Sequence, residues 1–168
     1  MKVCATERLQ LRRFTLDDAA FILQLLNEPS FLTNIGDKGV RTVDDAREYL
    51  RTGPLASYAQ HGFGLLLVEL QNTPIGMCGI LKRDGLDAPD IGYALLPRYW
   101  SQGYAIEAAT AVLQYAYITL QLNRILAITK PDNTASIRVL EKLGFVFTEM
   151  VKLPGAATES RLFTFVAE

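Results

Sequence analysis

The sequence predicts a mixed α/β fold, with helices packed on a central sheet in a single domain over residues 1–168. Three apolar segments separated by turn-forming residues are typical of a strand meander: 63–70, 74–81 and 90–96. Apolar residues then recur at near-helical spacing over 101–122. A strand-like segment at 124–129 precedes a second helical segment at 133–143. If strands 90–96 and 124–129 are parallel, the helix between them forms a right-handed crossover.

The two ends of the chain add further elements. Residues 7–12 alternate polar and apolar side chains, as a half-buried strand does. Thr15 and Thr42 each precede carboxylates at helix N-cap spacing. They predict helices over 15–27 and 42–60, with a loop over 30–41. The C-terminal segments 145–151 and 161–166 are expected to be antiparallel neighbouring strands.

Composition excludes several classes of protein. The 168 residues are 49% hydrophobic and 21% charged, as in ordinary globular domains. A net charge of −1 favours neither nucleic acid nor an anionic membrane as a partner. The sequence shows neither a signal peptide nor a membrane span, so we expect a cytoplasmic protein. Cys4 and Cys78 are too few for a disulfide framework or a metal site, so we expect buried thiols and no metal.

A glycine-marked turn joins strand 90–96 to the helix that follows. The first N–H groups of a helix have no intrahelical partner, and with the helix dipole they suit a phosphate. Gly103 permits a close approach of the backbone to a ligand, and Ala105 keeps the next turn small. Neither a phosphate loop nor a dinucleotide glycine motif is present. An isolated glycine would also be explained by a sharp turn.

Three segments together resemble the GNAT superfamily of N-acetyltransferases, in particular its ribosomal-protein alanine N-acetyltransferase branch. They are TERLQLR at 6–12, DIGYALLPRYWSQGYAIEA at 90–108 and PDNTASIRVLEKLGF at 131–145. Their order and spacing match the family over nearly the whole chain. The superfamily usually has Gln or Arg at the position of Trp100, whereas the ribosomal branch has an aromatic residue there. The resemblance implies a mixed sheet in which strand 90–96 splays from its parallel neighbour.

The resemblance also implies an acetyl-CoA site. The pantetheine arm would lie in the gap between the splayed strands, bonded by backbone groups near Leu95 and Leu96 and by Asn133. The pyrophosphate would be held by the backbone N–H groups of Ser101, Gln102, Gly103, Tyr104, Ala105 and Ile106. The hydroxyl of Ser136 would lie near the coenzyme sulfur.

Acetyl transfer needs a proton acceptor for the amine and a proton donor for the departing thiolate. A backbone N–H can stabilise the oxyanion that forms when the amine attacks the thioester. Ser136 is the predicted donor, although a serine near a helix start often only bonds the backbone. Asp90 is the predicted acceptor, directly or through water, with a solvated turn residue as the alternative. Glu107 is expected to support the helix dipole.

The predicted function is transfer of an acetyl group from acetyl-CoA to a primary amine in a ternary complex. A protein N-terminal α-amine and a small-molecule amine both remain open as acceptors. His61, the only histidine, either lines the acceptor pocket or is an incidental surface residue. Two alternatives remain: a non-catalytic acyl-CoA-binding sensor or interaction module of the same fold, and an unrelated nucleotide-binding protein. Both a monomer and a homodimer are compatible with the sequence.

Overall fold

A single mixed sheet of eight strands runs through the molecule, in the order β1-β2-β3-β4-β5-β6-β8-β7. The computed structural model describes residues 1–167, so the last residue of the expected 1–168 domain lies outside the described residues. The strands are β1 Lys2–Ala5, β2 Leu9–Arg13, β3 Leu65–Leu70, β4 Thr73–Leu81, β5 Asp90–Leu95, β6 Arg124–Thr129, β7 Val146–Val151 and β8 Ser160–Val166. Neighbouring strands pair antiparallel except β5 and β6, which pair parallel.

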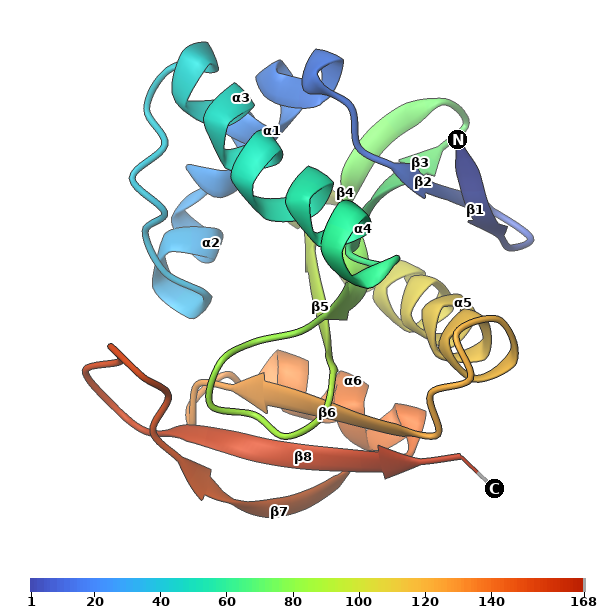
Figure 1. Cartoon of the computed structure of the whole chain (residues 1–168), viewed down its shortest axis with the longest axis vertical. Helices are drawn as coiled ribbons and strands as arrows, with labels where there is room; N and C mark the ends of the chain where they lie inside the picture. Colours follow the sequence, from blue (N-terminus) through green and yellow to red (C-terminus); the bar gives the residue numbers. More distant parts are fainter. Residues whose placement is uncertain (168) are drawn as a thin grey trace.

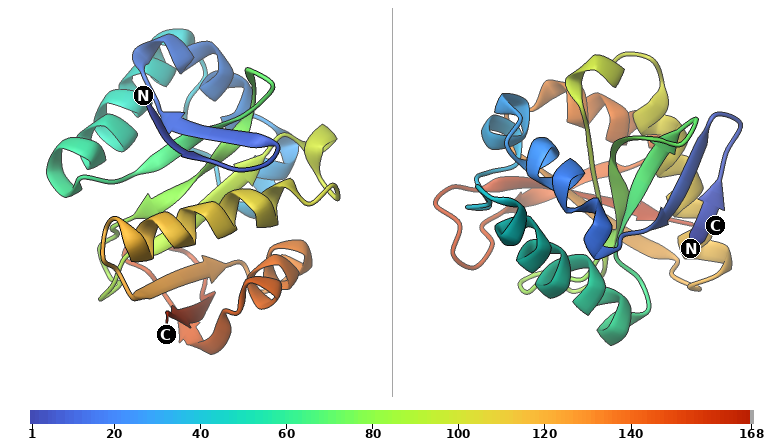
Figure 2. Two further views of the ribbon diagram at one scale, coloured as in Figure 1. Left: turned by 90° about the vertical axis from the view of Figure 1, so that its right-hand side faces the viewer. Right: turned by 90° about the horizontal axis from the view of Figure 1, so that it is seen from above.

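Helices cover both faces of the sheet (Figures 1 and 2). They are α1 Ala19–Leu26, α2 Pro29–Asn34, α3 Val43–Leu50, α4 Ala56–His61, α5 Tyr104–Ile118 and α6 Thr134–Leu143. Helix α5 packs with β4 and β5 in the larger hydrophobic core, and α6 contacts β6. Helices α1 and α3 pack on the opposite face in a second core. The predicted fold class is confirmed, and the parallel pair is the expected one.

The N-terminal third differs most from the sequence prediction. A short edge strand, β1, precedes the predicted first strand, and α2 occupies part of the segment 30–41 expected to be a loop. Helix α2 forms because Pro29 suits a first helical position and Phe31 becomes buried. The predicted helix 42–60 is interrupted by a π-helical turn, Arg51–Leu55. Pro54 lies inside that turn, where its missing N–H prevents regular helical bonding.

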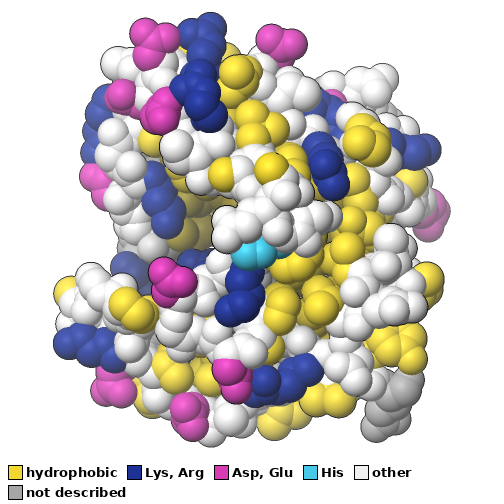
Figure 3. All heavy atoms as spheres, viewed as in Figure 1, with side chains coloured by type: hydrophobic (Ala, Val, Ile, Leu, Met, Phe, Trp, Pro, Cys, Tyr) yellow, Lys and Arg dark blue, Asp and Glu magenta, His cyan; other side chains and the backbone are white. Residues whose placement is uncertain are grey.

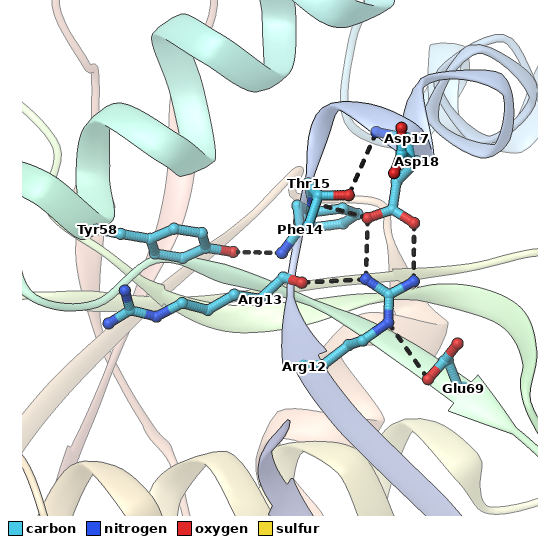
Figure 4. A network of polar contacts seen from close by, with 8 residues as sticks. All are labelled: Arg12, Arg13, Phe14, Thr15, Asp17, Asp18, Tyr58 and Glu69. Carbon is cyan, nitrogen blue, oxygen red and sulfur yellow. Dashed lines mark hydrogen bonds and ion pairs between the residues drawn. The ribbon is translucent and has the colours of Figure 1, made fainter. Parts of the chain in front are cut away.

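Polar contacts fasten the acidic helix start at Thr15–Asp18 to the sheet (Figure 4). The guanidinium of Arg12 donates to both carboxylate oxygens of Asp18, at 2.8 and 3.0 Å, and its Nε lies 3.4 Å from Glu69 Oε1. Tyr58, from α4, accepts a hydrogen bond from the Phe14 N–H at 3.1 Å. The side-chain cap predicted at Thr15 and the capping box predicted at Thr42 are both present, and Thr15 also forms a full capping box with Asp18. These contacts hold the α1–α4 layer over β2 and β3.

Within residues 1–167, none of the helices is both long and apolar enough to cross a membrane. The same residues contain no group of three His, Cys, Asp or Glu side chains placed to share a metal ion. Both cysteines are free: Cys78 is buried, as expected, and Cys4 is half-buried.

Candidate active site

The strands β5 and β6 touch only where they begin. Their register contains one pair, Asp90 with Leu126, supported by a 2.9 Å hydrogen bond from the Leu126 N–H to the Pro89 carbonyl. Beyond that pair the two strands run in different directions (Figure 1). The gap therefore opens toward their carboxyl ends, from which α5 and α6 start. Ligands of open α/β sheets bind at such places.

The edge of β5 that faces the gap carries backbone groups free of the β4 ladder. The Leu96 N–H donates to the Ile75 carbonyl at 2.8 Å, so Leu96 belongs to the β4 side. The alternation of an antiparallel ladder then directs the N–H and C=O of Leu95 and Tyr93 away from β4. The Leu95 carbonyl accepts from the Trp100 indole at 2.9 Å. Leu95 and Leu96 are the two residues whose backbone groups are expected to bond a pantetheine arm, and of these only Leu95 presents its N–H to the gap.

The end of β6 adds an unusual polar group on the other side of the gap. The hydroxyl of Thr129 is buried and has no hydrogen-bond partner among residues 1–167. Ile125 and Ala127 pack in the core beside α5, so strand alternation places Thr129 on that same face. A buried hydroxyl without a partner is costly, and a polar ligand in the gap would remove that cost.

The turn after β5 is built from left-handed backbone conformations. Ser101 has φ 61° and Gly103 has φ 84°, and neither value is compatible with a helix. Helix α5 therefore begins at Tyr104, not at residue 101 as predicted, and ends at Ile118, not at 122. The N–H groups of Tyr104, Ala105 and Ile106 lie in its first turn, where they lack intrahelical acceptors. Ser101, Gln102 and Gly103 form the turn that leads into it.

A residue far away in the sequence fastens this turn. Arg8, in the loop between β1 and β2, donates from Nε to Glu107 Oε1 at 2.7 Å and from Nη2 to the Gln102 carbonyl at 3.2 Å. Its guanidinium carbon lies 4.3 Å from the centre of the Tyr104 ring. Glu107 also accepts from the Arg8 N–H and from the Thr6 hydroxyl. Burial acts to raise the pKa of Glu107, but these hydrogen bonds hold it below its usual value. Glu107 thus braces the turn, beyond its expected effect on the helix dipole.

A hydroxyl pair links β5 to α6 on the α5 side of the sheet. The Tyr93 hydroxyl lies 2.8 Å from Ser136 Oγ and 3.2 Å from the Ser136 carbonyl. Asn133 caps α6, its Oδ1 accepting from the Ser136 N–H at 3.3 Å. Burial raises the pKa of Tyr93 to about 12, against the opposing effect of the Ser136 hydrogen bond, so its phenol remains protonated. Asn133, Ser136 and Tyr93 therefore meet at the gap.

Asp90 lies on the opposite face of β5. Ile91 and Leu95 pack in the core beside α5, so alternation turns Asp90 and Gly92 toward the α1–α4 layer. The Asp90 side chain is 0% exposed, and its Oδ2 accepts from Arg83 Nε at 2.9 Å. Its Oδ1 has no hydrogen-bond partner among the described residues. Burial raises the pKa of Asp90 to about 6, although the charge of Arg83 opposes the shift. The alternative of a solvated turn residue is wrong.

His61 lines a pocket of about 270 Å³ beneath α3 and α4, together with Tyr49 and Lys82. The pocket reaches Leu65 and Leu81, whose side chains pack over Gly92. That His61 contributes to acceptor binding stays a prediction.

Sequence reasoning missed Tyr93, Arg83 and Arg8. Tyr93 lies in the segment that carries the resemblance, three residues after Asp90, and strand alternation alone places those two on opposite faces. Arg83 and Arg8 lie in loops, and their partners Asp90 and Glu107 are identified only by the folded chain. The chain has 17 Lys and Arg residues, and the sequence around Arg8 and Arg83 does not distinguish these two as partners of buried or bracing carboxylates.

Comparisons with known proteins agree with this geometry. Residues 8–146 match the family model described as an acetyltransferase (GNAT) domain. The chain is 32% identical to p20, an uncharacterized N-acetyltransferase of Bacillus licheniformis, over 86% of this chain and 83% of that protein. It resembles the crystal structure of a GNAT-family acetyltransferase from Bacillus anthracis, with a TM-score of 0.80, 26% identity and coverage of 99% and 98%. RimL, a ribosomal L7/L12 α-N-protein acetyltransferase solved with coenzyme A, shares the fold, with a TM-score of 0.84, 18% identity and coverage of 99% and 98%.

Proposed function

The chain belongs to the GNAT acetyltransferase family and is an acetyl-CoA-dependent N-acetyltransferase, and on that premise we propose that its acceptor is a primary amine that attacks directly in a ternary complex. The observation that carries the proposal is the divergence of β5 from β6, which share a single residue pair, Asp90 with Leu126. One face of the sheet carries Tyr93 and Ser136, and the other carries Asp90. Donor and acceptor amine can therefore approach the same point from opposite sides.

The residues present fit coenzyme A. The first N–H groups of α5 and the turn at Ser101–Gly103 suit the pyrophosphate, as helix starts suit phosphates generally. The Leu95 N–H and the unpartnered Thr129 hydroxyl suit the amides of the pantetheine arm. The side chain of Asn133 is occupied in capping α6, so its contribution would be to place the helix start beside the gap. When bound, acetyl-CoA supplies the acetyl group as a thioester.

Two sets of side chains would handle the protons. The Ser136 hydroxyl, in contact with the protonated Tyr93 phenol, would donate a proton toward the departing sulfur. Asp90 has an oxygen without a partner and a pKa raised to about 6, so at neutral pH it is a carboxylate with some basicity. It would take the amine proton at its unpartnered Oδ1, directly or through a water molecule. Water-mediated proton transfer suits an α-amine with a pKa of about 8 better than a lysine near 10.4.

The cysteines support direct attack over an acyl-enzyme. A thiolate is the nucleophilic form of cysteine, and burial disfavours it. Burial raises the pKa of Cys4 to about 11 and that of Cys78 still higher. Both thiols are therefore protonated and unreactive at neutral pH.

The test is an initial-rate study of thiol release from acetyl-CoA with a panel of amines and short peptides. Direct transfer predicts intersecting double-reciprocal lines and an acetylated amine as product. Parallel lines, or radioactivity retained on the protein after incubation with labelled acetyl-CoA alone, would indicate an acyl-enzyme. If the protein binds coenzyme A in calorimetry but acetylates no member of the panel, the proposed acceptor class is wrong.

A further inference from the structure

The α1–α4 side of the gap is hollowed and basic. Figure 3 shows a hollow between α2 and β5 with a hydrophobic floor and Lys and Arg side chains along its margin. Gly92, in the middle of β5, turns toward this side, where the side chains of Leu81 and Leu65 pack over it. A side chain at Gly92 would place its Cβ 4.0 Å from Arg83 Nη2. The guanidinium of Arg83 therefore lies near Gly92, on the face of β5 from which the acceptor is proposed to approach.

Arg83 is held in place by only part of its hydrogen-bonding capacity. Its Nε donates to Asp90 Oδ2 at 2.9 Å, whereas its Nη atoms make no ion pair among residues 1–167. The Arg83 side chain is 36% exposed, in contrast to the buried Asp90. A guanidinium fork with one N–H fixed presents its remaining donors in a defined plane, the arrangement that suits a carboxylate.

Lys38 adds a second positive charge, close enough to Arg83 for the two charges to interact. It lies in the segment between α2 and α3 and forms no ion pair with any described residue. Burial lowers the pKa of Lys38, and the nearby charge of Arg83 lowers it further. The hydroxyl of Tyr49, from α3, is also close enough to Arg83 for that charge to oppose the rise in its pKa caused by burial. Lys38 is exposed and the Arg83 side chain is 36% exposed, so an anion from solution can reach both cations, and it is stabilised when it lies between them.

We propose that this hollow binds acceptors that carry a carboxylate close to the amine, and that Arg83 and Lys38 hold that carboxylate. The inference rests on the proposed function and narrows its acceptor class. Asp90 is then a positioning residue for Arg83 in addition to its proposed role as proton acceptor. A polycationic acceptor such as a polyamine is disfavoured, because it would meet like charges at Arg83 and Lys38.

The test compares matched acceptors. The peptides Asp-Ala-Ala-amide and Asn-Ala-Ala-amide differ only in one carboxylate near the α-amine, and kcat/KM is measured for both. Alanine and alaninamide form a second pair, which distinguishes an α-carboxylate from a side-chain carboxylate. We expect Lys38→Gln and Arg83→Gln each to reduce the acid-over-amide preference by roughly tenfold, as expected for a lost charged hydrogen bond. Lys38→Glu should reverse the preference.

Controls keep the outcome unambiguous. Arg124, the first residue of β6, pairs with Asp87, which lies in the same β4–β5 loop as Arg83. Arg124 lies outside the hollow, so Arg124→Gln should leave the acid-over-amide preference unchanged. Lys38 has no partner to disrupt, so its variants test the inference even if Arg83→Gln fails to fold. An acid-over-amide ratio that is unchanged in folded Lys38 and Arg83 variants would overturn the inference while leaving acetyl transfer intact. Absence of transfer to every acceptor, with coenzyme A binding preserved, would overturn the proposed function itself.

Discussion

The two ends of β5 form their parts of the site in different ways. At its carboxyl end, a turn with left-handed Ser101 and Gly103 presents backbone N–H groups at the start of α5. At its amino end, Asp90 is fully buried, half-satisfied by Arg83 and unpartnered at its other oxygen. The first end depends on backbone shape, which short-range sequence specifies. The second depends on a buried charge, which the side chain of Arg83 in the preceding loop makes tolerable.

This contrast agrees with the division of labour in the proposed reaction. In the proposed reaction, backbone N–H groups recognise the pyrophosphate of coenzyme A. Their use adds little cost in free energy, because the first N–H groups of a helix lack intrahelical partners in any case. Buried side-chain charges carry a desolvation cost, which proteins tolerate mainly where function needs them. Apart from tyrosines and cysteines, the described residue with a strongly shifted pKa is Asp90, at the amino end of β5.

The largest expected effect concerns the buried carboxylate of Asp90. Because burial raises its folded-state pKa from 3.8 to about 6, folding favours its protonated form. Stability is greatest below the lower value and declines as pH rises through the upper one, by about 3 kcal/mol for this group. Asp90→Asn removes that dependence. Urea unfolding of wild type and variant from about pH 4 to about pH 7 should show the variant gaining relative stability by this amount. A stability difference between wild type and variant that does not change with pH would contradict the raised pKa of Asp90.

The hydroxyl pair should affect turnover more than binding. Proton transfer to a leaving group contributes roughly 10²-fold or more to rate, so Ser136→Ala should lower kcat by about that factor. Tyr93→Phe should lower it less, since Ser136 remains, while coenzyme A affinity changes little in both variants. Thr134→Ala removes a neighbouring hydroxyl of the same helix and serves as the control. Equal losses in kcat and in coenzyme A affinity would indicate that the pair only binds.

The turn should be sensitive to a side chain at Gly103. Its φ of 84° is unfavourable for a β-branched residue by about 1–3 kcal/mol, so Gly103→Val should weaken coenzyme A binding by roughly ten- to a hundredfold. Calorimetry measures the change directly. Gly155→Val introduces the same residue at φ 79°, away from the turn, and should leave affinity unchanged. Similar affinities in folded Gly103→Val and wild type would mean that the phosphates lie elsewhere.

The smallest expected effect comes from the Arg8 brace. Arg8→Ala and Glu107→Gln each release the turn at a partly exposed ion pair, so we expect a modest, salt-dependent loss of coenzyme A affinity. If the two residues act through one contact, the double variant should lose little more than either single variant. Arg47→Ala, which breaks an exposed pair within α3, is the control. Strictly additive losses of affinity would show that Arg8 and Glu107 act independently of each other.

Much of the architecture could be predicted because its signals are local. The bounds of β6 and the C-terminal end of α6 at Gly144 agree with prediction, since apolar runs and a C-terminal glycine specify them within a few residues. The helix caps at Thr15 and Thr42 were predicted for the same reason. By contrast, α2 and the interruption at Arg51–Leu55 were missed, because burial of Phe31 and accommodation of Pro54 depend on packing against other elements.

The candidate site divides along the same line. The glycine turn and the starts of the two helices follow from residue types at short spacing, because backbone torsion and helix capping act over a few residues. The place of Ser136 at the site and the splaying of the parallel strands were implied by the resemblance to the GNAT superfamily. Tertiary structure alone decided that Tyr93 meets Ser136, that Arg8 braces the turn and that Arg83 lies beside a buried Asp90. Those pairs are separated by 43, 94 and 7 residues. Electrostatic and hydrogen-bonding partners are chosen by distance in space, which the chain defines only once it has folded.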